Sequence, residues 1–271
     1  MNTLGRLLAG GLWFFGAASA QALELGITEG VTYRATDKEI EARFAPIAEL
    51  LGKALKQPVH IQVLGGYNTM RERLREQQLD VAFIHPAHVA LEAVKAGTYR
   101  TLAWTAGFTE YRVTFLCKQP QPPIADWTTV AGKSFVTPDP DSITAVMTRA
   151  MLRKGGVKSE SIKMQNTRYQ DAVPFYVENG FANFGATAAK SVVKSWTDKG
   201  GQTCAESGPV PIKHWIAASR LDAATTASLR EALLGLTQSD AGRKALAAAN
   251  YSGFVASSDE TERSVIGWLG L

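Results

Sequence analysis

The stretch KSFVTPDPDSITAVMTRAMLRKGG (residues 133–156) contains a short apolar strand pattern, an acidic Pro-Asp turn and a helix pattern. Apolar side chains recur in the helix part with the i, i+3, i+4, i+7, i+8 spacing of an amphipathic helix, at Ile143, Val146, Met147, Ala150 and Met151. We expect the helix to begin near Ser142 and to end at Gly155-Gly156. The stretch therefore predicts one strand–turn–helix unit of an α/β fold.

The same alternation of strand and helix patterns fills most of the chain, in two rounds. The first round has strands at 23–28, 58–64, 79–84 and 101–106, with helices at 42–55, 68–78 and 87–96. The second has strands at 111–117, 133–139, 161–166 and 182–186, with helices at 142–154, 169–179 and 187–196. Helix patterns follow at 222–236, 239–250 and 259–270. This order predicts βαβ architecture with largely parallel sheets.

Two rounds of α/β structure predict two lobes with a ligand cleft between them. We expect residues 23–107 plus 208–271 to form lobe 1 and residues 108–207 to form lobe 2, with chain crossings near 106–110 and 201–209. Ligands of open α/β sheets collect beyond the carboxyl ends of the strands, where loops meet helix N-termini. The turn before Ser142 is one of the loops that this arrangement brings to the cleft.

The first 22 residues have the features of a cleavable secretory signal peptide. Arg6 precedes a short apolar run, and small residues at Ala18, Ala20 and Ala22 have the spacing of a signal-peptidase site. No later segment approaches the roughly 20 apolar residues of a membrane span. We therefore expect an exported, periplasmic protein. Removing the signal lowers the formal charge from +4 to +3, and without basic clusters this balance argues against nucleic-acid binding.

Two cysteines, Cys117 and Cys204, lie in β-like segments. Export to an oxidising compartment makes a disulfide between them reasonable if their strands are neighbours. The alternative is two buried free thiols, and the sequence leaves both open.

Ser142 and Thr144 lie where the helix of 142–154 begins, and two interpretations apply to them. A Ser or Thr at this position caps the helix by accepting a hydrogen bond from a first-turn N–H group. The same N–H groups, together with the positive end of the helix dipole, can also bind an anion.

The ordered set of motifs resembles the periplasmic substrate-binding proteins of phosphate/phosphite/phosphonate ABC transporters, a family with the type II periplasmic binding protein fold. Four segments carry the resemblance, over about residues 24–220: FAPIAELLGKAL, GGYNTMRERLREQQLDVAFIHPAHVAL, VAGKSFVTPDPDSITA and YQDAVPFYVENGFANFGATAAKS. The resemblance implies a solute-binding protein that closes its lobes on a small oxyanion. It implies a monomer, with a transporter permease as its partner and no cofactor.

The resemblance also implies a set of ligand-binding residues. Tyr67 would open a helix that faces the cleft, the segment of Ser142, Ile143 and Thr144 would offer hydroxyl and N–H groups, and Tyr169 and Asn183 would close from the second lobe. We add Tyr33 and His85 as further candidate ligand-binding residues, which the resemblance itself does not imply. Each tyrosine also has a structural interpretation, because Tyr67 could pack under its helix and Tyr169 could be an ordinary aromatic at a helix start.

The sequence departs from the family pattern at three places. It has Ile84-His85-Pro86-Ala87-His88 where a small Gly-Pro turn is common, Tyr169 where a His is common, and Asn183 where an Asp is common. These changes alter the hydrogen bonds available to a phosphonate. A different small polar ligand, or a role in presenting the bound form to a membrane histidine kinase, stays open.

Other chemistry has weaker support in the sequence. His85 and His88 have the H-x-x-H spacing that can bind a metal, but Pro86-Ala87 stand between them in place of the Glu of a zincin helix, and His60 and His214 have no ligand-like neighbours. We expect instead that His85 lines the cleft as a hydrogen-bond donor and that His88 caps a helix or faces solvent. Asp139 and Asp141 have the pattern of turn formers, and Ser142 lacks a nucleophile-elbow context. We therefore expect no enzyme activity.

Overall fold

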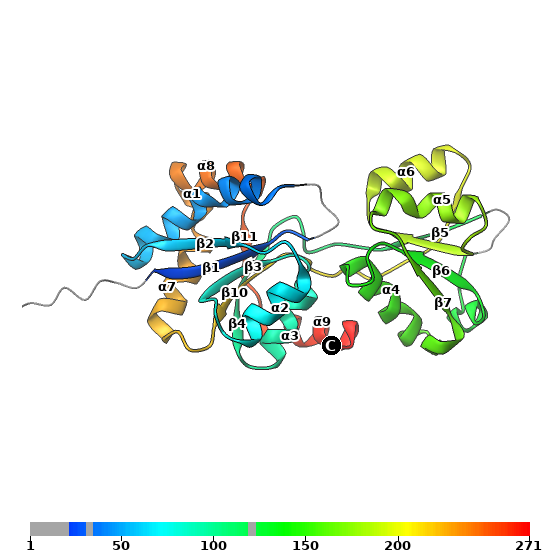
Figure 1. Ribbon diagram of the computed structural model, residues 1–271, viewed down its shortest axis with the longest axis horizontal. Coiled ribbons are helices and arrows are strands. Elements are labelled where there is room, and N and C mark those ends of the chain that lie inside the picture. The colour runs from blue at the N-terminus through cyan, green and yellow to red at the C-terminus, as the bar shows by residue number, and fades with distance from the viewer. Residues whose placement is uncertain (1–21, 31–34, 119–122) are drawn as a thin grey trace, which may run out of the picture.

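The computed structural model describes residues 22–30, 35–118 and 123–271. The described residues form two lobes, which lie side by side and are joined by two extended connections (Figure 1). Each lobe is built on one mixed β-sheet with helices on both faces, which confirms the predicted two-lobed α/β fold. The predicted signal peptide lies outside the described residues, apart from Ala22. Within them, no helix is both long enough and apolar enough to cross a membrane.

The sheet of lobe 1 has the strand order β11-β4-β10-β3-β1-β2. These strands are β1 (Leu23–Thr28), β2 (Val59–Val63), β3 (Val81–Ile84), β4 (Tyr99–Thr105), β10 (His214–Ala218) and β11 (Phe254–Val255). The sheet of lobe 2 has the order β7-β6-β8-β5-β9. Its strands are β5 (Thr114–Cys117), β6 (Ser134–Thr137), β7 (Lys163–Asn166), β8 (Phe184–Thr187) and β9 (Gln202–Glu206).

The prediction of largely parallel sheets is wrong. β1 pairs in parallel with β2 and β3, and β6 with β7 and β8, but β10 is antiparallel to β3 and β4, and β5 is antiparallel to β8 and β9. The reason is the double crossing. β5 and β10 each enter their lobe from the other lobe, so they run in the direction opposite to the strands of the βαβ units. The prediction also missed β10 and β11, which both pair antiparallel with β4.

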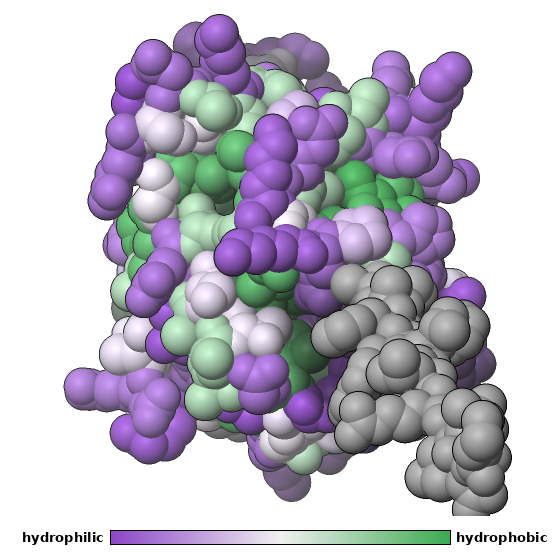
Figure 2. All heavy atoms as spheres, turned by 90° about the vertical axis from the view of Figure 1, so that its left-hand side faces the viewer, coloured by the Kyte–Doolittle hydropathy of each residue, from purple (hydrophilic) through white to green (hydrophobic). Residues whose placement is uncertain are grey.

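Side chains that alternate along the strands point to opposite faces of each sheet, and helices pack against both faces. In lobe 1, Leu25 and Ile27 pack with α1 (Asp37–Leu55), α7 (Ala223–Leu234) and α8 (Asp240–Ala249), whereas Ala82 and Ile84 pack with α2 (Tyr67–Arg75) and α3 (Ala87–Lys95). Figure 2 views the molecule from the lobe-1 end and shows hydrophilic side chains around several separate hydrophobic areas.

Lobe 2 has the same layering. α4 (Ile143–Lys154) packs on one face of its sheet, and α5 (Val173–Glu178) and α6 (Lys190–Asp198) pack on the other. α4 confirms the predicted boundaries, with Ser142 as its N-cap and Gly155 as its C-cap. Short 3-10 turns lie at Trp127–Val130, Ser159–Ser161, Gln170–Ala172 and Leu236–Gln238.

α1 begins at Asp37, five residues before the predicted start. Its N-cap Thr36 accepts a hydrogen bond from the Glu39 N–H group at 3.3 Å, and the Glu39 carboxylate accepts one from the Thr36 N–H group at 2.8 Å. This reciprocal pair is a capping box, whose T-x-x-E pattern is visible in the sequence.

The two connections, residues 106–113 and 207–213, lie against each other. Tyr111 and Val210 exchange two backbone hydrogen bonds, of 3.2 and 2.9 Å, in an isolated antiparallel bridge. The expected lobe boundaries after residues 107 and 207 fall within these connections and stay a prediction, because strand order does not fix the point at which one lobe ends.

The last helix, α9 (Asp259–Leu269), lies at the junction of the lobes, beside α3 (Figure 1). Val265 and Leu269 pack into a core cluster that contains residues of both lobes. Arg153 of α4 donates a 2.8 Å hydrogen bond to the carbonyl of Trp268, and Lys95 of α3 donates one to the carbonyl of Leu271. The C-terminal helix therefore contacts both lobes.

The predicted pairing of cysteines is present. Cys117 of β5 and Cys204 of β9 form a disulfide between neighbouring strands of lobe 2, with their Cα atoms 6.0 Å apart. Both cysteines are buried.

Candidate functional site

Strand register determines which residues face the space between the lobes. In lobe 1, Thr28 pairs with Ile84 and Ile84 pairs with His214, so the residues just beyond these ends share one edge of the sheet. In lobe 2, the corresponding edge contains Thr137 and Thr187. Both inter-lobe connections leave from these edges, which therefore face each other across the cleft.

The N-terminus of α4 lies at the lobe-2 edge. Ser142 is 4% exposed, and its hydroxyl accepts a 3.2 Å hydrogen bond from the Ala145 N–H group, so the predicted capping role is confirmed. Within the described part of the chain, the N–H groups of Ile143 and Thr144 have no hydrogen-bond acceptor. Capping by Ser142 thus leaves two first-turn donors for another acceptor.

A chain of side chains orients the Thr144 hydroxyl. The side-chain oxygen of Gln170 accepts hydrogen bonds from the Thr187 hydroxyl and from the Ala188 and Ala189 N–H groups, at 2.7 to 3.0 Å, which fixes the orientation of its amide. The Gln170 nitrogen therefore donates to the Tyr111 hydroxyl at 3.3 Å. The Tyr111 hydroxyl lies 3.0 Å from the Thr144 hydroxyl, and either of the two can be the donor.

When Tyr111 is the donor in this pair, the hydroxyl proton of Thr144 is left for another acceptor. Burial raises the pKa of Tyr111, although its hydrogen bonds with Thr144 and Gln170 oppose that effect, so the phenol keeps its proton at neutral pH. The sequence did not identify Tyr111 or Gln170. Only their positions in the sequence could have indicated them, because Tyr111 lies in a segment that connects the lobes and Gln170 directly follows the predicted Tyr169.

Tyr67 and His85 lie together on the lobe-1 side. Tyr67 is the first residue of α2, His85 follows β3, and both are at least 95% buried. Gly30, with a φ of +92°, passes so close that a Cβ atom there would lie 2.7 Å from His85 Cδ2 and 3.2 Å from the Tyr67 hydroxyl oxygen. A side chain at residue 30 would therefore clash with this wall of the cleft.

His85 is neutral, and its hydrogen-bonding roles differ from the prediction. Burial, reinforced by the positive charge of Lys213, lowers the pKa of His85 to about 3. Its Nδ1 lies 3.0 Å from the carbonyl oxygen of Ile212 and must donate to it. In the neutral ring, Nε2 is then an acceptor. The prediction of a donor in the cleft is wrong, because the ring's one proton is used inside lobe 1.

A buried cluster of charges lies beside His85. Lys213 donates to the Tyr251 hydroxyl at 2.8 Å and to the Glu29 carboxylate at 3.3 Å, and its Nζ lies 4.5 Å from the centre of the Phe108 ring. Arg43 pairs with the same carboxylate. Burial lowers the pKa of Lys213, and Glu29 opposes this shift.

Two cations thus share one acid, since no other carboxylate of the described residues lies within 4.0 Å of Lys213 or Arg43. Residues 1–21, 31–34 and 119–122 contain no Asp or Glu. The cluster therefore has a net positive charge. The sequence could not reveal it, because its members are far apart along the chain.

The remaining predicted residues have different positions. Tyr169 is half-buried at the end of β7, on the cleft side, with Arg168 stacked over its ring. Asn183 is exposed at the opposite end of the lobe-2 sheet, where its side chain accepts two 2.9 Å hydrogen bonds from Ser134. The prediction that Asn183 closes on the ligand is wrong, because β8 runs from Asn183 toward the cleft. Tyr33 lies outside the described residues.

His88 and Asp141 also differ from the predictions. His88 is 1% exposed, and its Nε2 lies 3.2 Å from an Asp141 oxygen across the lobe boundary, so it neither caps a helix nor faces solvent. Asp139 accepts a hydrogen bond from the Asp141 N–H group at 2.9 Å, as expected of a turn former, whereas the Asp141 carboxylate faces lobe 1. No group of three or more His, Cys, Asp or Glu in the described residues could hold a metal ion.

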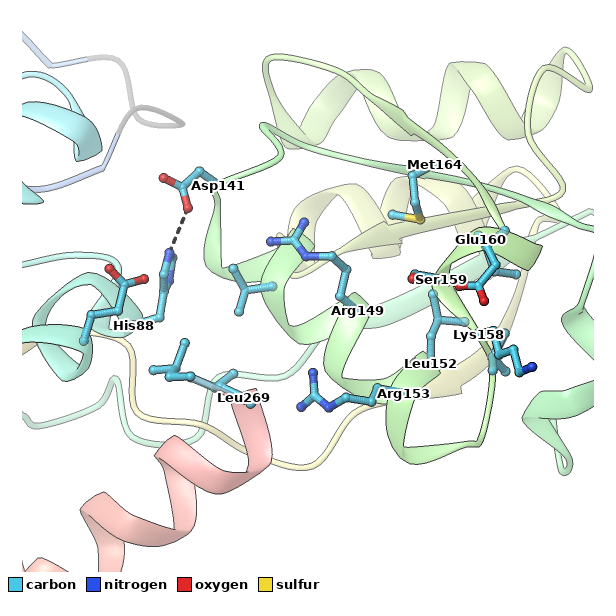
Figure 3. Close-up of a pocket in the computed structure, with 16 residues that line it drawn as sticks. His88, Asp141, Arg149, Leu152, Arg153, Lys158, Ser159, Glu160, Met164 and Leu269 are labelled. Carbon is cyan, nitrogen blue, oxygen red and sulfur yellow. Dashed lines mark hydrogen bonds and ion pairs between the residues drawn. The ribbon is translucent and has the colours of Figure 1, made fainter. Parts of the chain in front are cut away.

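A pocket of about 560 Å³ lies next to this contact, on the side of α4 that faces α9 (Figure 3). Figure 3 shows the Asp141 carboxylate directed at His88, with Arg149 of α4 in the middle of the pocket and Leu269 below it. The lining combines apolar and charged side chains, among them Val146, Leu152, Arg153, Lys158, Glu160 and Met164.

Comparison with known proteins identifies the family. Residues 30–261 match the family described as ABC transporter, phosphonate, periplasmic substrate-binding protein. The chain belongs to this family. It is a family of binding proteins, which confirms that the chain is a periplasmic-type substrate-binding protein and not an enzyme.

Solved structures with this fold have low sequence identity to the chain. A Xanthomonas citri protein bound to ATP is 14% identical, with a TM-score of 0.74 over 92% of this chain and 96% of that one. PhnD1 from Prochlorococcus marinus, in complex with methylphosphonate, is 15% identical, with a TM-score of 0.65 over 91% and 96%. A binding protein component of an ABC phosphonate transporter from Pseudomonas aeruginosa is 15% identical, with a TM-score of 0.63 over 92% and 85%.

Proposed function

We propose that this protein is exported and binds a small phosphate-like oxyanion, such as a phosphonate, between its lobes, for delivery to an ABC transporter. The observation that carries the proposal is the set of unused donors at the N-terminus of α4. The N–H groups of Ile143 and Thr144 have no acceptor among the described residues, and the Thr144 hydroxyl lies in the same helix turn. Two N–H donors and a hydroxyl in one helix turn suit the oxygen atoms of a single oxyanion.

Charge also favours an anion. The positive end of the α4 dipole supplies a partial charge on the lobe-2 side. The cluster of Lys213, Arg43 and Glu29 supplies a net positive charge at the lobe-1 edge. An anion between the two lobes therefore interacts favourably with both, and this difference between the open and closed states drives closure.

The neutral His85 adds a preference within the class of oxyanions. Because its Nε2 can only accept, a ligand oxygen in contact with it must carry a proton. The monoanion of a phosphonate or of phosphate has such an oxygen. A sulfonate has none at neutral pH, so we expect phosphonate to bind more tightly than a sulfonate of the same size.

A thermal-shift panel tests the proposal on the mature protein. The ligands are methylphosphonate, phosphate, phosphite, ATP, methanesulfonate and acetate. A ligand at 100 times its dissociation constant stabilises the native state by about 2.7 kcal/mol, which is a readily measured rise in melting temperature. We expect a rise with one or more phosphorus oxyanions and a smaller one with methanesulfonate. No rise with any of them would refute the proposed ligand class.

Delivery to a transporter predicts that genes for a permease and an ATPase adjoin the gene of this protein. A gene for a membrane histidine kinase in their place would instead support the sensing role.

A further inference from the structure

A cluster of charged side chains joins the two lobes outside their apolar packing. Arg71 of α2, in lobe 1, donates to both oxygens of Asp141, in the lobe-2 turn before α4, and the Nη2–Oδ1 distance is 3.0 Å. His88 of α3 adds its 3.2 Å contact to the same carboxylate. Asp141 directly precedes Ser142, the N-cap of α4.

Arg71 is held in place from within its own lobe. Glu92 of α3 accepts hydrogen bonds from Arg71 Nε at 2.6 Å and from Nη2 at 3.0 Å. Burial would lower the pKa of Arg71, but its bonds to Glu92 and Asp141 outweigh this and raise it, so the guanidinium is fully charged. Two hydrogen bonds to Glu92 fix the orientation of the Arg71 guanidinium within lobe 1. The guanidinium is therefore already oriented toward lobe 2 before the lobes meet.

The turn that contains Asp141 is equally well defined. The Asp139 side chain accepts from the Asp141 N–H group, and the Asp139 carbonyl accepts from the Ser142 N–H group, both at 2.9 Å. Arg149 donates a 2.8 Å hydrogen bond to the Pro140 carbonyl. A force on the Asp141 carboxylate is therefore transmitted to the start of α4.

Electrostatics gives Arg71 a second effect on the anion site. A carboxylate one residue before the N-cap would repel an anion bound at the α4 N-terminus. Burial would raise the pKa of Asp141, but the hydrogen bonds from His88 and Arg71 and the charge of Arg71 hold it well below its usual range, so the carboxylate is ionised. Arg71 neutralises that charge only when the lobes are together.

We propose that Arg71 is a positioning residue for the ligand site: through Asp141 it latches lobe 1 to the N-terminus of α4, and so it sets both lobe closure and oxyanion affinity. The effect on affinity rests on the proposed function, whereas the latch itself acts in the ligand-free protein. Because Arg71 and Asp141 are partly exposed, the pair tunes the equilibrium between open and closed lobes and does not lock it.

The test combines inter-lobe distances with binding in a double-mutant cycle. Spin labels at Lys53→Cys on α1 and Lys194→Cys on α6, both exposed, report the distance between the lobes by double electron–electron resonance. The variants are Arg71→Met, Asp141→Asn and the double substitution. The matched control is Arg73→Met, which removes an arginine of the same helix whose side-chain partner, Gln78, lies in lobe 1.

The latch predicts that each single substitution lengthens and broadens the inter-lobe distance distribution without ligand, while Arg73→Met leaves it unchanged. It also predicts that Arg71→Met weakens methylphosphonate binding about tenfold, and that the double variant is no weaker than the worse single one. Unchanged distances in Arg71→Met, or the same change in Arg73→Met, would overturn the latch. Strictly additive losses of affinity would do the same. If the wild-type protein binds no oxyanion, the proposed function fails, and the ligand-free distances still decide for or against the latch.

Discussion

The hydroxyl of Tyr111, in the first connection between the lobes, lies 3.0 Å from the hydroxyl of Thr144, in the first turn of α4. Gln170 donates to the same phenol from the end of the lobe-2 sheet. The connection of residues 106–113 and the candidate anion site therefore share one hydrogen-bonded chain. Movement of this connection when the lobes close is linked to the Thr144 hydroxyl through Tyr111.

Tyr111→Phe removes the centre of this chain. We expect it to destabilise the native state by about 1 kcal/mol, because the buried Thr144 hydroxyl loses its hydrogen-bond partner. Oxyanion affinity falls several-fold, because the Thr144 hydroxyl is no longer held in place beside the first-turn N–H groups. Urea unfolding and calorimetric titration measure the two effects. Tyr176→Phe is the control, since the Tyr176 hydroxyl makes no hydrogen bond with any described residue. Equal losses of affinity in both variants would contradict this role of Tyr111.

Ser142 caps α4 and also lies at the candidate site. A second N-cap serine, which lies away from that site, allows the effect of capping to be measured by itself. Ser239 caps α8 in the same way, with its hydroxyl 3.0 Å from the Gly242 N–H group. Ser142→Ala and Ser239→Ala should each cost about 1 kcal/mol of unfolding free energy. Ser142→Ala alone should also weaken oxyanion binding. If both variants bind like the wild-type protein, Ser142 is a cap and nothing more.

Two buried histidines predict how stability depends on pH. Burial lowers the pKa of His85 and of His214 to about 3, below the ordinary value of 6.5. The unfolded chain therefore binds more protons than the native protein between these values. Their contribution to stability is complete above about pH 6.5 and is lost as the pH falls toward 3, by up to about 1.4 kcal/mol per pH unit for each histidine.

Urea unfolding between pH 4 and pH 7 measures this slope. His85→Gln should reduce it, because this substitution removes one of these two buried imidazoles. A slope that His85→Gln leaves unchanged would contradict a buried neutral His85.

The disulfide between Cys117 and Cys204 joins residues 87 positions apart. Closing so long a loop in the unfolded chain accounts for about 4 to 5 kcal/mol of stability in the chain-entropy description. We expect the double variant Cys117→Ala/Cys204→Ala to lose a large part of this free energy in urea unfolding. The wild-type protein under reducing conditions should show a similar loss. A difference of less than about 1 kcal/mol would mean that the bridge contributes little.

The sequence predicted the local elements and the two lobes, because hydrophobic periodicity and caps are local signals. α4 shows this well, with its N-cap at Ser142 and its end at Gly155. Strand direction was predicted wrongly for β5, because it depends on which lobe the chain comes from, and β10, which enters lobe 1 in the same way, was not predicted as a strand. β11 was missed because its two residues, Phe254 and Val255, are too short for a pattern.

The candidate site was predictable only where its residues lie next to one another in the sequence, as Ser142, Ile143 and Thr144 do. Contacts between distant segments were not predictable. In the sequence Arg71 is one of several arginines of the helix at 68–78, and only the folded chain brings it to Asp141. Asn183 was misplaced because the sequence gives the order of strand and loop but not the end of the sheet at which the loop lies.

The most direct test of the account removes one backbone donor of the oxyanion site. Proline is well accommodated at the first position of a helix, where it lacks only an N–H group that the helix does not use. Ser142, with φ −69° and ψ 153°, already has the extended conformation that a following proline requires. Ile143→Pro therefore deletes the Ile143 donor and keeps α4, and Ile143→Ala controls for the lost side chain.

Calorimetric titration of both variants with methylphosphonate, or with whichever oxyanion stabilises the wild-type protein most, is the measurement. The account predicts that Ile143→Ala binds within a few-fold of the wild-type protein and that Ile143→Pro binds at least about tenfold more weakly. Equal affinities of Ile143→Pro and Ile143→Ala would contradict oxyanion binding at the N-terminus of α4.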